Sequence, residues 1–190
     1  MKFVIFVFAL CACSQDFFEV RGTQDKYRYV DWAHTFSNKV TSDLYYIGTP
    51  GYNEIAACAG YALPTTKGLS IIPFVCGATA KEDSVKAVKF ATAFYWEKKS
   101  WKADAYYAHL KSFHSHSQNY HVLDAGNLTY SITKKCEVGI STGFFHQDGK
   151  WNPQYGPLVR RNDAFGYWGV SLRTGSTNEL RVIRTFTLKH

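Results

Sequence analysis

The chain has 190 residues, a length typical of a single domain. Aromatic residues make up 17% of it, and its 22 Lys and Arg residues exceed its 15 Asp and Glu residues. No run of five or more like charges occurs, which argues against a nucleic-acid-binding protein. The excess positive charge instead suits an anionic partner: lipopolysaccharide, a phospholipid surface or an anionic polysaccharide.

The first fourteen residues predict a secretory signal peptide. Lys2 precedes a short apolar run, Phe3–Ala12, which is too short to span a membrane as a helix. Two processing patterns overlap here. Ala12–Ser14 resembles an ordinary cleavage site before Gln15, and Leu10–Cys13 resembles a lipobox that would leave Cys13 lipidated. We expect the ordinary site, and we expect export with either one.

The rest of the chain divides into an N-terminal segment, 15–26, and one folded domain, 27–190. No later segment approaches the roughly 18 consecutive apolar residues that a spanning helix needs. If the protein crosses a membrane, we therefore expect it to cross as strands.

Apolar and polar residues alternate through most of the domain, which is the period of a half-exposed strand. The clearest case is 127–147, where a turn at Lys134-Lys135 places Tyr130 opposite Val138. In this hairpin both strands put their apolar residues on the same face, so the register is self-consistent.

Other segments predict strands and turns of the same kind. The remaining strands are expected at 28–36, 55–63, 69–78, 88–97, 168–172 and 180–182, with turns at 64–68, 98–100 and 173–179, and longer loops at 79–84, 111–119 and 148–162. These elements predict an all-β fold: an antiparallel up-and-down β-barrel of eight to ten strands.

The polar face of these strands is rich in small residues, which suits the crowded interior of a barrel. They include Gly139, Ser141, Gly143, Ala91 and Ala93. In a membrane barrel the apolar face points outwards to lipid, whereas in a soluble ligand-binding barrel it points inwards. Alternation alone does not separate the two, although the bulk and aromatic content of the apolar face favour the membrane form.

Two segments resemble strand–turn–strand units of bacterial outer-membrane β-barrel proteins: Asn127–Phe145 and Ala164–Leu188. The resemblance is to a class and covers most of the chain. It implies export and insertion into the outer membrane. The chain departs from the class at Pro73, which lies within a predicted strand, and in having cysteines in its strands.

For the function, we expect a small outer-membrane barrel with a structural, adhesion or accessory and transport role, without catalysis and without a cofactor. So few strands enclose little space, which argues against a general porin. The first alternative is a soluble secreted barrel that binds a small apolar ligand. The second is a lipid hydrolase acting at the barrel rim, with Ser115 or Ser117 beside a histidine.

The stretch 109–121 contains four histidines. His114 and His116 project to the same side of an extended chain and, with His121, could bind Zn or Cu. The alternative is a polar external loop that is rich in histidine.

Two cysteines fall opposite each other, or one step diagonal, when the chain is folded about residues 66–67. Cys58 and Cys76 then lie on the same polar face and could form a disulfide after export. The alternative is that they are two small residues filling the interior.

The segment Asp148–Asp163 combines turn signals with aromatic and basic residues. Trp151, Tyr155, Arg160 and Arg161 could hold a sugar or a phosphate, because guanidinium groups bind anions and aromatic rings stack on sugars. The alternative is a solvated surface loop.

Overall fold

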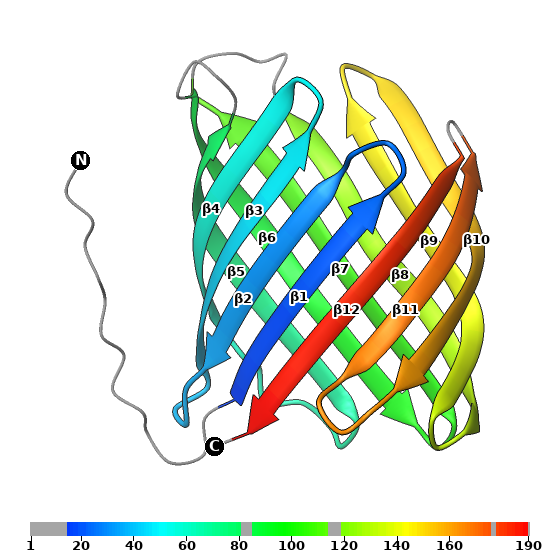
Figure 1. The fold of residues 1–190 in the computed structure, drawn as a ribbon. Coiled ribbons are helices and arrows are strands. Elements are labelled where there is room, and N and C mark those ends of the chain that lie inside the picture. The colour runs from blue at the N-terminus through cyan, green and yellow to red at the C-terminus, as the bar shows by residue number, and fades with distance from the viewer. Residues whose placement is uncertain (1–14, 81–84, 114–118, 176–177, 190) are drawn as a thin grey trace.

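The computed structural model describes residues 15–80, 85–113, 119–175 and 178–189, and within these ranges twelve antiparallel strands close into one barrel (Figure 1). The strands are β1 (Gln15–Thr23), β2 (Arg28–Thr35), β3 (Val40–Thr49), β4 (Tyr52–Tyr61), β5 (Leu69–Ala80), β6 (Val85–Lys98), β7 (Trp101–Ser112), β8 (Tyr120–Thr133), β9 (Cys136–Gln147), β10 (Lys150–Asn162), β11 (Tyr167–Gly175) and β12 (Glu179–Lys189). Each strand pairs with its neighbour in the chain, and β1 pairs with β12 to close the ring. Among the described residues, no helix is long and apolar enough to cross a membrane.

The predicted architecture is confirmed, but the barrel has twelve strands instead of eight to ten. Part of the difference comes from two segments. Residues 15–23 were placed in a segment before the barrel, and they form β1. Residues 148–162 were predicted to be a loop, and most of them form β10.

Prolines and turn residues obscured the alternation in β10. Pro153 and Pro157 both lie within this strand. The β10–β11 ladder runs to Tyr155, skips the next two positions and resumes at Leu158. Pro157, which has no N–H, therefore lies where the β10–β11 ladder is interrupted. A strand tolerates proline at such a position.

The predicted hairpin at 127–147 has the expected register. Tyr130 pairs with Val138 and Leu128 with Ile140, as the alternation required. The same order continues around the wall, where Val138, Val159, Val170 and Val182 form a row of directly paired residues from β9 to β12. One register therefore fixes which residues face outwards over a third of the barrel.

The apolar face of the strands points outwards, as predicted for a membrane barrel. Phe90, Ile140 and Val170 are 52%, 56% and 48% exposed. Every strand contributes at least one large apolar side chain to this outer surface: Val20, Val30, Leu44, Ile55, Val75, Phe90, Tyr107, Leu128, Ile140, Val159, Val170 and Val182. The strands are 8 to 14 residues long, close to the roughly 9–11 that a tilted membrane-spanning strand needs.

The inner face carries charge instead of apolar bulk. Its buried Asp, Glu, Lys and Arg residues are Glu19, Arg21, Asp31, Asp43, Glu54, Lys89, Glu137, Arg160, Arg173 and Arg181. A soluble barrel for an apolar ligand would have the opposite polarity. The protein is therefore a transmembrane β-barrel of the bacterial outer-membrane type.

The two rims are defined here by the chain ends. The lower rim in Figure 1 is the one where β1 begins and β12 ends, and the upper rim is the opposite one. Trp101 and Trp168 lie near the lower rim, and Trp151 lies near the upper rim. Aromatic residues at both ends of the strands are typical of barrels whose rims meet the membrane surface.

Candidate functional site in the barrel lumen

The lumen contains two cavities. The lower cavity, of about 460 Å³, is lined by residues such as Glu19, Asp104 and Arg160. The upper cavity, of about 650 Å³, is lined by residues such as Tyr52, Asp124 and Arg181. Both volumes lie within the usual range of small-molecule sites. The interior of this barrel is therefore not filled by side chains, contrary to the expectation from fewer strands.

Tyr29 and Tyr106 line both cavities, so they mark the level at which the two meet. Arg21 lines the lower cavity only, whereas Asp124 lines the upper cavity only. The ion pair between Arg21 and Asp124 therefore spans the division between the two cavities.

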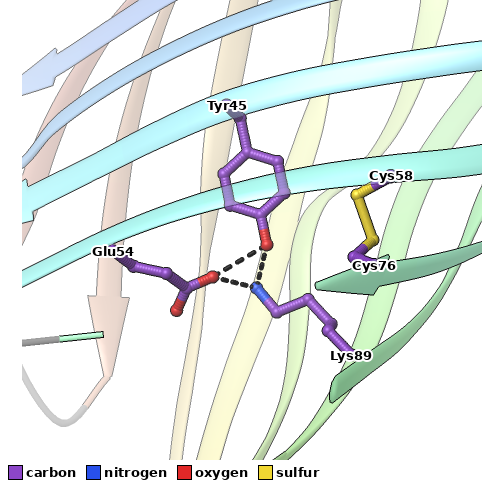
Figure 2. Close-up of a disulfide and its surroundings, with 5 residues drawn as sticks. All are labelled: Tyr45, Glu54, Cys58, Cys76 and Lys89. Atoms are coloured by element: carbon purple, nitrogen blue, oxygen red, sulfur yellow. Dashed lines mark hydrogen bonds and ion pairs between the residues drawn. A yellow bond between two sulfur atoms is a disulfide. The ribbon is translucent and has the colours of Figure 1, made fainter. Parts of the chain in front are cut away.

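A buried carboxylate on β4 anchors one wall of the upper cavity. Glu54 is fully buried and accepts hydrogen bonds from the hydroxyls of Tyr45, Tyr52 and Tyr120 at 2.7, 2.5 and 2.6 Å. Its Oε1 also accepts a hydrogen bond from Nζ of Lys89 at 2.5 Å (Figure 2). These residues come from β3, β4, β6 and β8, so the contacts hold four strands together. We call these five residues the Glu54 cluster.

A disulfide lies next to this cluster on the lumen wall (Figure 2). Cys58 and Cys76 are directly paired residues of β4 and β5, and their sulfur atoms are 2.08 Å apart. Cys76 is in turn paired with Lys89 on β6. The covalent link and the Lys89–Glu54 ion pair therefore reinforce the same part of the wall. Cys136, at the start of β9, is a free cysteine.

A second carboxylate, on β8, lies on the other side of the upper cavity and is shared by three arginines. Nη1 of Arg181 lies 2.5 Å from Oδ1 of Asp124, and Arg21 binds the other carboxylate oxygen. Nη1 of Arg173 lies 3.8 Å from Oδ1. Arg173 also donates to the hydroxyl of Ser141, at 2.9 and 2.6 Å. We call Asp124 and these three arginines the Asp124 cluster.

The lower cavity has its own network. Arg160 binds Asp104 through two hydrogen bonds of 2.7 and 2.9 Å, a bidentate arrangement. Glu137 accepts hydrogen bonds from Lys102 at 2.6 Å and from Asn162 at 2.8 Å. These side chains link β7 to β10 near the lower rim.

Buried arginines and buried carboxyl residues are concentrated on different strands of the lumen, although β1 carries buried Glu19 as well as Arg21. Four consecutive strands of the ring, β10, β11, β12 and β1, each carry one buried arginine. We call this set the arginine wall: Arg160, Arg173, Arg181 and Arg21. The next three strands, β2, β3 and β4, each carry one buried carboxyl residue. We call that set the acidic wall: Asp31, Asp43 and Glu54. The two walls together impose an electric field on anything that enters the lumen.

The four residues predicted to hold a sugar or a phosphate are not brought together. Arg160 points into the lumen, whereas Trp151 and Tyr155 are on the outer face and are 61% and 65% exposed. Arg161 is exposed on the same outer face as these two residues. The four residues lie on two faces because 148–162 is largely a strand, and neighbouring residues of a strand point to opposite faces.

His121 lies in a row of outward-facing rings near the upper rim. It pairs with His109 on β7 and with His146 on β9, and His146 pairs with Trp151 on β10. The rings of His109 and His121 are stacked with centroids 4.1 Å apart. No group of three or more His, Cys, Asp or Glu residues in the described part of the chain could hold a metal ion.

The other two predicted metal ligands, His114 and His116, lie outside the described residues, as do Ser115 and Ser117. The metal site and the rim hydrolase therefore stay predictions.

Sequence reasoning missed most of the lumen site. The sequence pattern predicts Arg21 before the barrel and Arg173 in a turn, and it does not distinguish Arg181 from other strand residues. The signal was present in the alternation: Arg181 stands between Leu180 and Val182, which both face outwards. A charged residue between two lipid-facing residues must face the lumen.

No family model matches the chain, and no curated protein sequence matches it. The structure resembles solved outer-membrane porins. A structure titled KdgM porin in complex with disordered oligogalacturonate superposes with a TM-score of 0.66 at 14% identity, covering 91% of this chain and 98% of that one. A NanC porin structure superposes with a TM-score of 0.59 at 11% identity, covering 94% and 100%. These similarities show that the two proteins share a porin fold with this chain.

Proposed function

We propose that the protein is a porin-like channel of the bacterial outer membrane that passes small anionic solutes, with acidic saccharides as the substrate class. The observation that carries this proposal is the arginine wall, which follows the whole lumen. Arg160 and Arg21 line the lower cavity, and Arg173 and Arg181 line the upper one. A carboxylate moving through the channel would meet a guanidinium in each cavity.

The chemistry of the upper cavity suits a sugar acid. Arginine recognises carboxylates through paired hydrogen bonds. Six tyrosines also line this cavity: Tyr27, Tyr29, Tyr45, Tyr52, Tyr106 and Tyr120. Tyrosine offers a ring face for stacking together with a hydroxyl for hydrogen bonding. The structure titled as a complex with oligogalacturonate, a chain of sugar acids, shares this barrel fold and supports the same substrate class.

The proposal assigns the outer surface to membrane lipid. The apolar band of outward residues suits the hydrocarbon core, and the exposed Arg161 near the lower rim suits the anionic groups of a membrane surface. Lipopolysaccharide is the partner we propose for the outer leaflet. The proposal includes no catalytic step and no cofactor.

Ion selectivity in planar bilayers tests the proposed channel. Under a potassium chloride gradient, we expect wild-type protein to conduct with a reversal potential on the anion-selective side. Arg173 lies 3.8 Å from the carboxylate of Asp124, and its hydrogen bonds go to the neutral hydroxyl of Ser141. Its positive charge is therefore the least neutralised of the four in the arginine wall. We expect Arg173→Gln to shift the reversal potential towards cation selectivity.

The matched control is Arg161→Gln, which makes the same change on the outer face of β10. We expect it to keep the wild-type reversal potential. Liposome swelling with glucuronate and glucose gives a second measurement, in which glucuronate should enter faster. A wild-type protein that conducts nothing, or two variants with equal shifts, would contradict the proposal.

A further inference from the structure

We propose that Asp124 is an internal counter-ion of the arginine wall, and that a solute carboxylate passes the middle of the channel by taking its place. This inference rests on the proposed function, because it explains how an anion could use arginines that are already paired. Asp124 thereby determines how strongly the channel prefers anions.

The first support is that the Asp124 cluster crosses the lumen. Asp124 stands on β8 and Arg21 on β1, which are five positions apart in a ring of twelve strands. Their ion pair therefore joins nearly opposite sides of the barrel. It also spans the division between the lower and upper cavities, which Tyr29 and Tyr106 mark. A solute that moves from one cavity to the other must pass or displace this pair.

The second support is the balance of charge. Each of two arginines has a carboxylate of its own in addition to the shared one: Arg21 binds Glu19, and Arg181 binds Glu179 at 2.6 Å. With Arg173, the three arginines carry three positive charges, and these two glutamates supply two negative ones. Asp124 supplies the third, so the six groups together are neutral when all of them are ionised. Without that carboxylate, one positive charge is left for an incoming anion.

The third support is that Asp124 is accessible to a solute. Its side chain is 16% exposed and lines the upper cavity, whereas the side chain of Glu54 on the other wall is 0% exposed. An anion that enters from the upper rim therefore meets Asp124 first, beside Arg181 and Arg173, whose side chains line the same cavity at 6% and 1% exposure. It can compete for the same guanidinium hydrogen atoms.

The fourth support is the local backbone of β8. The ladder from β8 to β9 is irregular between Leu123 and Gly126, and the next residue after Asp124, Ala125, has a φ of 53°. The ladder from β7 to β8 is interrupted at the same level. Bulges of this kind interrupt the pairing of a strand locally. Asp124 is paired with Tyr106 on β7, but on its other side it falls in the irregular part of the ladder to β9.

The test compares single-channel conductance and reversal potential of wild type and Asp124→Asn in planar bilayers. The asparagine keeps the shape of the side chain and removes its charge. We expect the conductance in potassium chloride to rise by about twofold or more and the reversal potential to shift towards anions, because the freed charge raises the local anion concentration. Glucuronate should then block the chloride current at a lower concentration than in wild type.

Two further variants separate this role from a general effect. Asp148→Asn makes the same change in the exposed turn between β9 and β10 at the upper rim, and it should behave as wild type. Asp124→Glu restores a carboxylate and should restore a conductance closer to that of wild type. Heat-modifiable migration on gels shows that each variant has formed a barrel.

The outcomes distinguish the two proposals. If wild type conducts with anion preference and Asp124→Asn is unchanged, or changes no more than Asp148→Asn, the counter-ion role is wrong and the channel proposal stands. If Asp124→Asn becomes more cation-selective, the counter-ion role is wrong as well. If neither wild type nor Asp124→Asn conducts, both proposals are wrong.

Discussion

The upper cavity has a carboxylate on each side, and the two are held in different ways. Glu54 binds one lysine and three tyrosine hydroxyls and is fully buried. Asp124 binds arginines alone and remains partly exposed to the cavity. The number of hydrogen bonds and ion pairs that a buried carboxylate makes therefore does not by itself determine what that carboxylate does. The side chain of Glu54 has no exposed surface, whereas that of Asp124 is 16% exposed in the upper cavity.

The largest expected effect is on the stability of the Glu54 side. Lys89→Met removes the cation that compensates Glu54, and both side chains are almost completely buried, at 1% and 0% exposure. Removing one partner of a buried pair costs about 3–5 kcal/mol of unfolding free energy. Urea unfolding of the barrel in lipid vesicles, followed by tryptophan fluorescence, measures this loss. Arg173→Gln, on the Asp124 side, should cost less than half as much, and equal losses would remove the distinction between the two sides.

The disulfide should give the next largest effect. The double variant Cys58→Ser, Cys76→Ser removes the disulfide, which joins residues 18 positions apart in the sequence. For a loop of this size we expect a loss of roughly 3 kcal/mol of unfolding free energy. The same urea experiment measures it, with and without a reducing agent on the wild type. The reversal potential should stay unchanged, because the arginine wall lies on other strands. A change in ion selectivity would show that the two sides are coupled.

The smallest expected effect concerns single hydrogen bonds. Tyr52→Phe removes one of the hydroxyls that bind Glu54, and a hydrogen bond to a charged group is worth about 1.5–3 kcal/mol. The matched variant is Tyr27→Phe, which keeps the ring on which Arg181 stacks at 5.4 Å. We expect Tyr27→Phe to change the unfolding free energy by about 0.5 kcal/mol or less, as is usual away from such contacts. The comparison would be contradicted if the two variants lost the same stability.

The fold was largely predictable because alternation is a strong signal in a membrane barrel. Because lipid surrounds the barrel and the lumen is charged, apolar residues alternate with polar ones along each strand, as in Leu180, Arg181 and Val182. The signal failed where other residues interrupted it. In β10 the two prolines are typical of a loop, so the sequence predicts a loop there. β1 follows directly after the predicted signal peptide, and its short alternating pattern does not distinguish it from a segment outside the barrel.

The lumen site was much less predictable. Alternation indicates that the side chains of Asp124 and Arg21 face the lumen. It does not indicate which residue each of them contacts across the lumen. Arg21 and Asp124 are 103 residues apart in sequence. Their contact depends on the number of strands that separate them around the ring, and a barrel of eight or ten strands would pair different residues.

The pairing of β1 with β12 has a consequence for how the protein forms. Gln15 lies beside Lys189, and Phe18 lies beside Phe186, so the closing seam joins the two ends of the described chain. Contacts between such distant residues are slow to form, because a long loop must close before they can be made. Until that moment both outermost strands have an unpaired edge, and an unpaired edge is prone to aggregation. Closure of this seam removes the last unpaired edges of the barrel, so a carrier that shields β1 and β12 until they pair would suit this protein.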